Sequence, residues 1–156
     1  PFIQTGEVVK ANAGIVGYSQ TLNEEGLKVS KLFEPPIILI TIAANIGDTA
    51  ILNYKACFPD SVVGIMPSNH FELKFMQICL QDKKPYLNQI APQAAQKNIN
   101  VKILQDVLIP KPPLSVQQEI VAQIEAEQEM VNANKKLIEI YEQKVKDKIG
   151  EVWGEE

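Results

Sequence analysis

Residues 109–131, IPKPPLSVQQEIVAQIEAEQEMV, join a proline-rich connector to a long helix. Lys111-Pro112-Pro113 cannot supply the backbone donors of a helix interior or a central strand, so a rigid hinge is predicted over residues 111–114. Ser115, followed by Gln118 three residues later, is typical of a capping box at a helix start. No proline or glycine follows before Gly150. Roughly 34 uninterrupted residues at 1.5 Å each predict a helix of about 50 Å.

The predicted helix, residues 115–150, carries apolar residues at the spacing of a coiled coil. The positions expected to contact a partner helix are Ile120, Ile124, Val131, Asn134, Ile138, Tyr141 and Val145. Asn134 and Glu127 are polar members of this line, and such residues fix register and partner choice. The alternative is a helix packed on its own domain. A domain of about 110 residues is only about 30 Å across, so part of the helix would still need another partner.

Charge is divided unevenly along the chain. Residues 1–116 hold ten lysines and nine acidic residues, for a net charge of +1, whereas residues 117–156 hold five lysines and ten acidic residues, for −5. All 15 basic residues are lysine. Proteins that bind nucleic acid are usually basic, so any DNA contact is expected in the front domain, residues 1–110.

The front domain is expected to contain short strands. The run IILITIA, residues 37–43, is continuously apolar and rich in β-branched residues, which predicts a central strand buried on both faces. A turn over residues 45–48 and the run TAILNY, residues 49–54, predict a hairpin with that strand. Further strands are expected in FIQTGEVV (2–9), KVSKLF (28–33), ACF (56–58) and VVGIM (62–66).

Residues 70–84, HFELKFMQICLQDKK, predict a helix with Phe71, Phe75, Ile78 and Cys79 on one face. Residues 86–100 are rich in amides and are expected to be irregular. Strands early and helices late predict an α+β fold, with a small mixed or twisted sheet followed by a long, coiled-coil-forming C-terminal helix. The chain begins at Pro1 rather than at a methionine, and we expect it to be part of a longer protein that lacks its first segment here.

Catalytic and metal-binding arrangements find little support in the sequence. His70 is the single histidine, and Cys57 and Cys79 lack metal or redox spacing, so we expect no metal site and two buried thiols in a reducing cytoplasm. The chain has neither a GxGxxG segment nor a P-loop, so no cofactor is expected. No apolar run approaches the roughly 20 residues of a membrane span, so no membrane partner is expected.

What remains is a candidate binding surface of amides and lysines. Amides read adenine edges and lysines reach phosphates or guanine, which suits double-stranded DNA. The candidate residues are Lys28, Lys31, Asn45, Asp48, Thr49, Gln89, Gln93, Gln96, Lys97 and Asn98. Ordinary solvated loops have the same composition, so composition alone does not separate these two interpretations.

The segment LQDVLIPKPPLSVQQEIVAQIE, residues 104–125, resembles the junction between a target recognition domain and the conserved helix in type I restriction-modification specificity subunits. The matching positions are Leu104, Val107, Ile109, Pro110, Pro112, Pro113, Leu114, Gln118 and Ile120. FIQTGEV resembles the family's early Thr-Gly-Asp segment, with Glu7 replacing Asp. Residues 35–52 resemble its strand-turn-strand unit, and residues 92–104 its polar loop before a final strand.

The resemblance implies a non-catalytic protein in which residues 1–110 read one half of a bipartite DNA target and the helix acts as a spacer. The implied partners are DNA, a methyltransferase (modification) subunit and, through it, a restriction subunit. The helix would pair with a second recognition domain or with a second copy. Two alternatives remain open: the specificity region of a single-chain methyltransferase-nuclease, and a helical protein-interaction module with no role on DNA.

Overall fold

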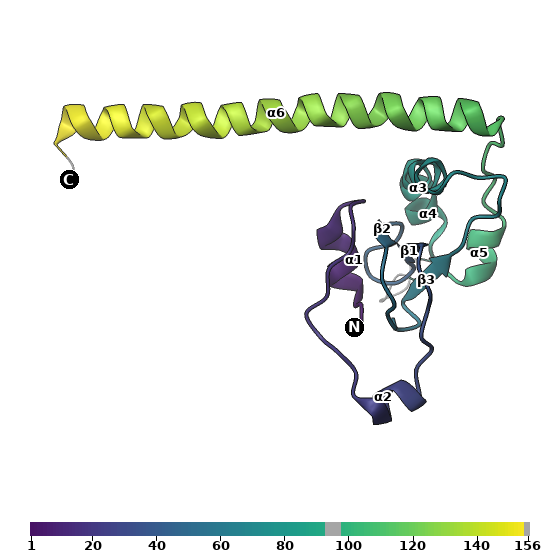
Figure 1. Ribbon diagram of the computed structural model, residues 1–156. Coiled ribbons are helices and arrows are strands. Elements are labelled where there is room, and N and C mark those ends of the chain that lie inside the picture. The colour runs from purple at the N-terminus through teal and green to yellow at the C-terminus, as the bar shows by residue number, and fades with distance from the viewer. Residues whose placement is uncertain (93–97, 155–156) are drawn as a thin grey trace. The chain divides into compact units, whose positions relative to one another are not determined.

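The structure is a computed structural model that describes residues 1–92 and 98–154. The chain divides into two compact units, Pro1–Gln117, here called the head, and Gln118–Glu156, the helical unit. The elements are α1 (Thr5–Ala11), α2 (Glu24–Lys28), β1 (Ile37–Thr41), β2 (Thr49–Leu52), β3 (Val62–Ile65), α3 (Leu73–Asp82), α4 (Lys84–Ile90), α5 (Val101–Gln105) and α6 (Leu114–Trp153) (Figure 1). This confirms the expected α+β class, with a small sheet and a long C-terminal helix.

The three strands form one antiparallel sheet in the order β2-β1-β3, so the run at Ile37–Thr41 is the central strand, as predicted. Every residue of β1 is buried. Leu39 lies in one core cluster with Val8 of α1, and Ile40 lies in a second cluster with Leu80 of α3 and Leu87 of α4. Because successive strand residues point to opposite faces, covering both faces requires an uninterrupted apolar run rather than alternation.

The expected strand in residues 2–9 is wrong. Residues Thr5–Ala11 form helix α1, and only Phe2 bridges to other segments. The Gln4 backbone N–H donates to the Glu7 carboxylate at 2.6 Å, while the Glu7 backbone N–H donates to the Gln4 backbone carbonyl at 3.1 Å. These hydrogen bonds pair backbone N–H groups that the start of a helix leaves without partners. The alternation of residues in the sequence gives no sign of such pairing.

The expected strand in residues 28–33 is also wrong, although its alternation suggested one. Asn23 caps helix α2 by accepting from the Gly26 N–H at 2.9 Å, and the chain then continues without a strand. Phe33 makes an isolated antiparallel bridge to Ala56, and this bridge region replaces the strand expected at residues 56–58.

The second half of the head is more helical than predicted. Residues Val101–Gln105 form α5 at the end of the segment that resembled a polar loop, and Asn100 caps this helix by accepting from the Ile103 N–H at 3.0 Å. Part of the region expected to be irregular forms α4, Lys84–Ile90. Helix α3 is present as predicted. Its buried residues are Phe75, Gln77 and Leu80, whereas Ile78 and Cys79 are half-buried, as is Phe71, which precedes the helix.

Helix α6 has 40 residues, so it is about 60 Å long. It begins at Leu114, with the amides of Val116 and Gln117 donating to the Pro113 carbonyl at 3.0 and 3.1 Å. Ser115 therefore lies inside the helix and not at the cap position predicted for it. Within residues 1–92 and 98–154, no helix combines the length and the hydropathy needed to cross a membrane.

Candidate nucleic-acid interface and helix face

The turn between β1 and β2 is held by hydrogen bonds around Thr41. Its hydroxyl donates to the Asn45 carbonyl and accepts from the Asp48 N–H at 3.0 Å, while the Gly47 N–H donates to the Thr41 carbonyl at 2.9 Å. Gly47 has φ of 86°, a backbone conformation that side chains disfavour. The turn thus presents the exposed Asn45 on a fixed backbone.

Helix α4 is fastened to this turn. Lys84 pairs with Asp48 at 2.6 Å, and the Asn88 amide donates to the Ile46 carbonyl at 2.9 Å. A Cβ atom on Gly47 would lie 3.1 Å from the Lys84 Cα, so the two backbones approach closely because residue 47 has no side chain. The same helix carries the exposed Gln89.

A third segment lies beside the residues that follow β1. Asn98 bridges to Ala43, and the Ile99 N–H donates to the Ile42 carbonyl at 2.8 Å. Three of the predicted amide residues therefore lie on segments that the fold brings together: Asn45 on the turn, Gln89 on α4, and Asn98 beside the end of β1. We call Asn45, Gln89 and Asn98 the amide surface.

Other predicted DNA contacts are placed differently. Thr49 is only 2 % exposed and its hydroxyl accepts from the Gln77 amide at 3.4 Å, so it faces the interior of the head and offers no contact to DNA. Asp48 is bound to Lys84, as described above. Gln93, Gln96 and Lys97 lie outside the described residues.

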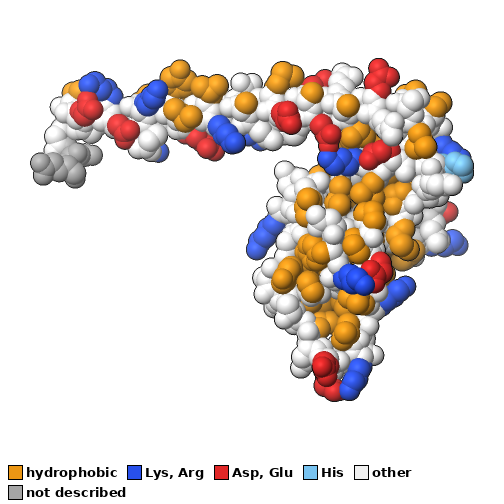
Figure 2. All heavy atoms as spheres, viewed as in Figure 1, with side chains coloured by type: hydrophobic (Ala, Val, Ile, Leu, Met, Phe, Trp, Pro, Cys, Tyr) orange, Lys and Arg blue, Asp and Glu red, His pale blue; other side chains and the backbone are white. Residues whose placement is uncertain are grey.

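Lys28 is the last residue of α2, which Figure 1 draws apart from the strands, whereas Lys31 follows α2 and lies near Val62 of β3. Lys28 pairs with Glu25 at 2.6 Å, and the Lys31 ammonium lies 4.9 Å from the centre of the Phe33 ring. On the face drawn in Figure 2, some lysine side chains of the head lie directly beside acidic side chains. Of the ten predicted residues, three therefore form the amide surface, Lys28 and Lys31 lie at or after the end of α2, Asp48 and Thr49 are engaged within the head, and three lie outside the described residues.

Glu7 lies outside the predicted binding residues and has a structural role in the head. Its carboxylate accepts from the Gln4 N–H and the Ser19 N–H, each at 2.6 Å, and from the Ser19 hydroxyl. Burial alone would raise the pKa of Glu7, but these hydrogen bonds, together with the charge of Lys10, outweigh burial and hold the pKa below its usual value. Glu7 thus ties the start of α1 to the loop at Ser19.

We expect the head to lose stability in acid partly through Glu7. Because its pKa is lower in the folded state, its contribution is present above the unfolded-state pKa and is lost as the pH falls through the folded-state value. Glu7→Gln should lower the melting temperature at neutral pH and reduce the further loss between about pH 5 and about pH 3. Thermal melts across this range check the prediction, with Glu24→Gln as an exposed control. An unchanged pH dependence in Glu7→Gln would contradict it.

The histidine and the cysteines are placed as follows. His70 is exposed, and its backbone carbonyl accepts a hydrogen bond from Gln117. Cys57 is buried, whereas Cys79 is half-buried, and burial raises the pKa of the Cys79 thiol, which disfavours the reactive thiolate. Across the part of the chain that the structure describes, no three His, Cys, Asp or Glu side chains gather as metal ligands would.

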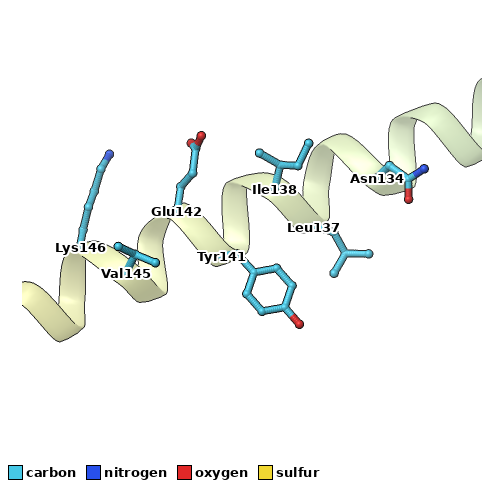
Figure 3. Close-up of a pocket in the computed structure, with 7 residues that line it drawn as sticks. All are labelled: Asn134, Leu137, Ile138, Tyr141, Glu142, Val145 and Lys146. Atoms are coloured by element: carbon cyan, nitrogen blue, oxygen red, sulfur yellow. The ribbon is translucent and has the colours of Figure 1, made fainter.

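The predicted seam of α6 is exposed to solvent over most of its length. Ile124, Val131, Ile138, Tyr141 and Val145 are between 37 and 59 % exposed. Figure 3 shows the part of this surface around Asn134, where Leu137 and Tyr141 project to one side of the helix and Ile138 to another. The Lys144 ammonium lies 5.4 Å from the centre of the Tyr141 ring. A helix that leaves so many apolar side chains in water has a surface suited to a partner.

Comparison with known proteins identifies the class of protein. The family model of the type I restriction modification DNA specificity domain matches residues 1–142, which include the head and most of α6. The chain therefore belongs to this family, as the resemblance in the sequence predicted.

Individual relatives agree with that assignment. A protein of Methanocaldococcus jannaschii named as the type I restriction enzyme MjaX specificity subunit is 30% identical over 123 residues, which are 78% of this chain and 29% of that protein. The HsdS subunit from Thermoanaerobacter tengcongensis superimposes with a TM-score of 0.63 at 28% identity, covering 85% of this chain and 31% of the other.

A second solved structure, which concerns complex assembly and conformational transition of the type I restriction-modification system, contains a chain with a TM-score of 0.65 and 26% identity. The match covers 87% of this chain and 32% of that chain. The present chain thus spans about three tenths of the length of these relatives.

Proposed function

We propose that the head reads one half of a bipartite DNA target and that α6 serves as spacer and docking helix for a methyltransferase subunit, which in turn brings in the restriction subunit. The observation that carries this proposal is the family match, which runs across the head and into α6 and so treats both as parts of one specificity domain. In this proposal the chain itself is not catalytic and acts in the cytoplasm, where its DNA and partners are found.

The charges of the two units support this division of labour. The lysines and acidic residues of residues 1–116 sum to +1, and those of residues 117–156 sum to −5, so DNA would approach the head rather than the helix. All 15 basic residues are lysine, which leaves lysine and the amide surface to carry base recognition. A head with so little net positive charge would neutralise few phosphates and would bind DNA weakly without its partners.

The charge along α6 supports antiparallel pairing with a second such helix, either from another recognition domain or from a second copy. Residues 118–134 contain four acidic residues and no lysine, whereas residues 135–154 contain five lysines and four acidic residues. An antiparallel partner would place lysine-bearing turns beside the acidic turns, whereas a parallel partner would place the acidic turns together. Opposite charges flanking an apolar seam are a common determinant of helix orientation.

The test is a map of modified bases in the host genome with and without the gene for this chain. Deletion should remove one bipartite N6-methyladenine motif, and restoring the gene should restore it. Loss of a continuous, asymmetric motif would instead indicate the specificity region of a single-chain methyltransferase-nuclease. An unchanged map in cells that express the intact neighbouring genes would reject a role in DNA recognition and favour a protein-interaction module.

Complementation with variants tests the amide surface itself. Restoring the gene as Asn45→Ala should reduce methylation of the motif or relax one base in a half-site, because a lost amide–base contact costs about 1–3 kcal/mol of discrimination. Asn53→Ala is the matched control, since Asn53 is also exposed but follows β2 instead of lying in the turn. An unaltered motif and methylation level with Asn45→Ala would remove Asn45 from the proposed interface.

A further inference from the structure

Gln117, the last residue of the head, has a fully buried polar side chain. Its amide group donates to the His70 carbonyl at 2.9 Å and to the Pro112 carbonyl at 2.8 Å. Its side-chain oxygen accepts from the Glu72 N–H at 2.9 Å. One side chain thus joins the segment before α3, the proline connector and the first turn of α6. We call these three hydrogen bonds the Gln117 clasp.

The Gln117 clasp lies wholly within the head. Glu72 also caps α3, because its carboxylate accepts from the Phe75 N–H at 2.6 Å. The segment that Gln117 holds is therefore itself fixed to a packed helix, whose Phe75 and Leu80 are buried. Because the Gln117 side chain is fully buried and its hydrogen bonds to these backbone groups are partly buried, losing the amide would leave partly buried donors and acceptors unpaired.

The first turn of α6 would be less constrained without this side chain. Proline supplies no N–H to bind the connector to the head, so the backbone of Pro112 and Pro113 can only accept hydrogen bonds. The clasp uses the Pro112 carbonyl in this way. Gln118, the next residue, is exposed and provides a natural comparison.

We propose that Gln117 is a positioning residue: its buried amide fastens the first turn of α6 to the head and thereby keeps constant the spacing between the two half-sites that the assembled enzyme accepts. This inference rests on the proposed function, because the spacing of half-sites matters only if the head reads one of them and α6 is the spacer. Gln117 contacts no DNA in this proposal.

The experiment uses the full native chain assembled with its methyltransferase subunit. Methylation rates are measured on duplexes that carry the motif from the deletion map with its natural spacer and with spacers one base pair shorter and longer. For Gln117→Leu we expect the preference for the natural spacer to fall by about tenfold, since displacements near 1 Å strongly affect catalysis on a positioned substrate. Gln118→Leu, the same change at an exposed position, should keep the preference of the unaltered chain.

Hydrogen exchange provides a second measurement, which requires no methyltransferase. The Glu72 amide should exchange about tenfold faster in Gln117→Leu than in Gln118→Leu, as expected for the loss of roughly 1.4 kcal/mol of protection. If Gln117→Leu does not fold, Gln117→Glu takes its place, because a carboxylate keeps the acceptor for Glu72 but removes both donors.

The outcomes separate this inference from the proposed function. An unchanged spacer preference in a folded Gln117 variant that still methylates the motif overturns the role of Gln117 and leaves DNA recognition intact. Unchanged exchange at Glu72 shows that the clasp does not hold the segment, and this also overturns the inference. If the unaltered chain directs methylation of no motif at all, the proposed function fails, and the proposed role of Gln117 in spacing fails with it.

Discussion

Leu39→Ala is expected to lower the free energy of unfolding of the head by about 2–5 kcal/mol, the range typical of large-to-small changes in a core. Leu39 is fully buried at the middle of β1, the central strand. Its cross-strand partners are Ala50 and Gly64, which are too small to fill the space that a shortened side chain would leave. The ring of Phe58 already lies over Gly64. The cavity would therefore persist.

Chemical denaturation followed by circular dichroism measures this effect. The control is Leu108→Ala, which makes the same change at a residue that is 87 % exposed and should shift the free energy of unfolding by less than about 0.5 kcal/mol. Because small domains have about 5–15 kcal/mol of stability in total, the Leu39 variant should lose a large part of it. Equal effects of the two substitutions would contradict the placement of Leu39 at the centre of the core.

Ile138→Asp is expected to abolish helix pairing through α6, provided that the seam is the pairing surface proposed above. Ile138 belongs to the predicted seam and is 57 % exposed in the single chain, so an isolated α6 should tolerate the change. In a paired helix the same position would be buried, and an unpaired carboxylate there costs several kcal/mol. We expect an affinity loss of at least about a hundredfold, which corresponds to roughly 2.7 kcal/mol.

Light scattering over a range of concentrations measures self-pairing, and co-purification measures capture of the methyltransferase subunit. The matched control is Ile140→Asp, because Ile140 is similarly exposed but lies two residues along, on a different side of the helix. Loss of association in Ile138→Asp alone supports the seam. Equal losses in both variants would indicate a general effect of added charge, and no loss in either would place the partner surface elsewhere.

The sequence was a good guide where one local signal dominates. The proline connector and the uninterrupted residues after it predicted α6, and the continuous run from Ile37 predicted the buried central strand. The sequence was a poor guide where hydrogen bonds to a capping residue start a helix in a segment whose residues do not show a helical pattern. Residues 5–11, 24–28 and 101–105 are helical, and side chains such as Asn23 and Asn100 accept hydrogen bonds at two of their starts. Such bonds depend on backbone geometry that the residue pattern does not report.

The sequence indicated which types of residue the candidate interface contains, but not which individual residues belong to it. Thr49 and Asn45 are both polar residues near one turn, yet Thr49 lies in a strand facing Gln77 while Asn45 is exposed. Gln117 and Gln118 are adjacent and identical in type, and the family pattern was matched at Gln118. Only the packing of the segment before α3 distinguishes them, because it surrounds Gln117 and leaves Gln118 in water.

The sequence by itself thus determined the long amphipathic helix, its junction with a separate domain, the central strand and the family, because periodicity, proline and apolar runs act over neighbouring residues. Tertiary structure decided which polar side chains lie on neighbouring segments and which are buried. Asn45, Gln89 and Asn98 come from segments far apart in the chain, and hydrogen bonds from Asn88 and Ile99 bring those segments together. Contacts of this kind depend on how the whole head packs, and no local pattern encodes them.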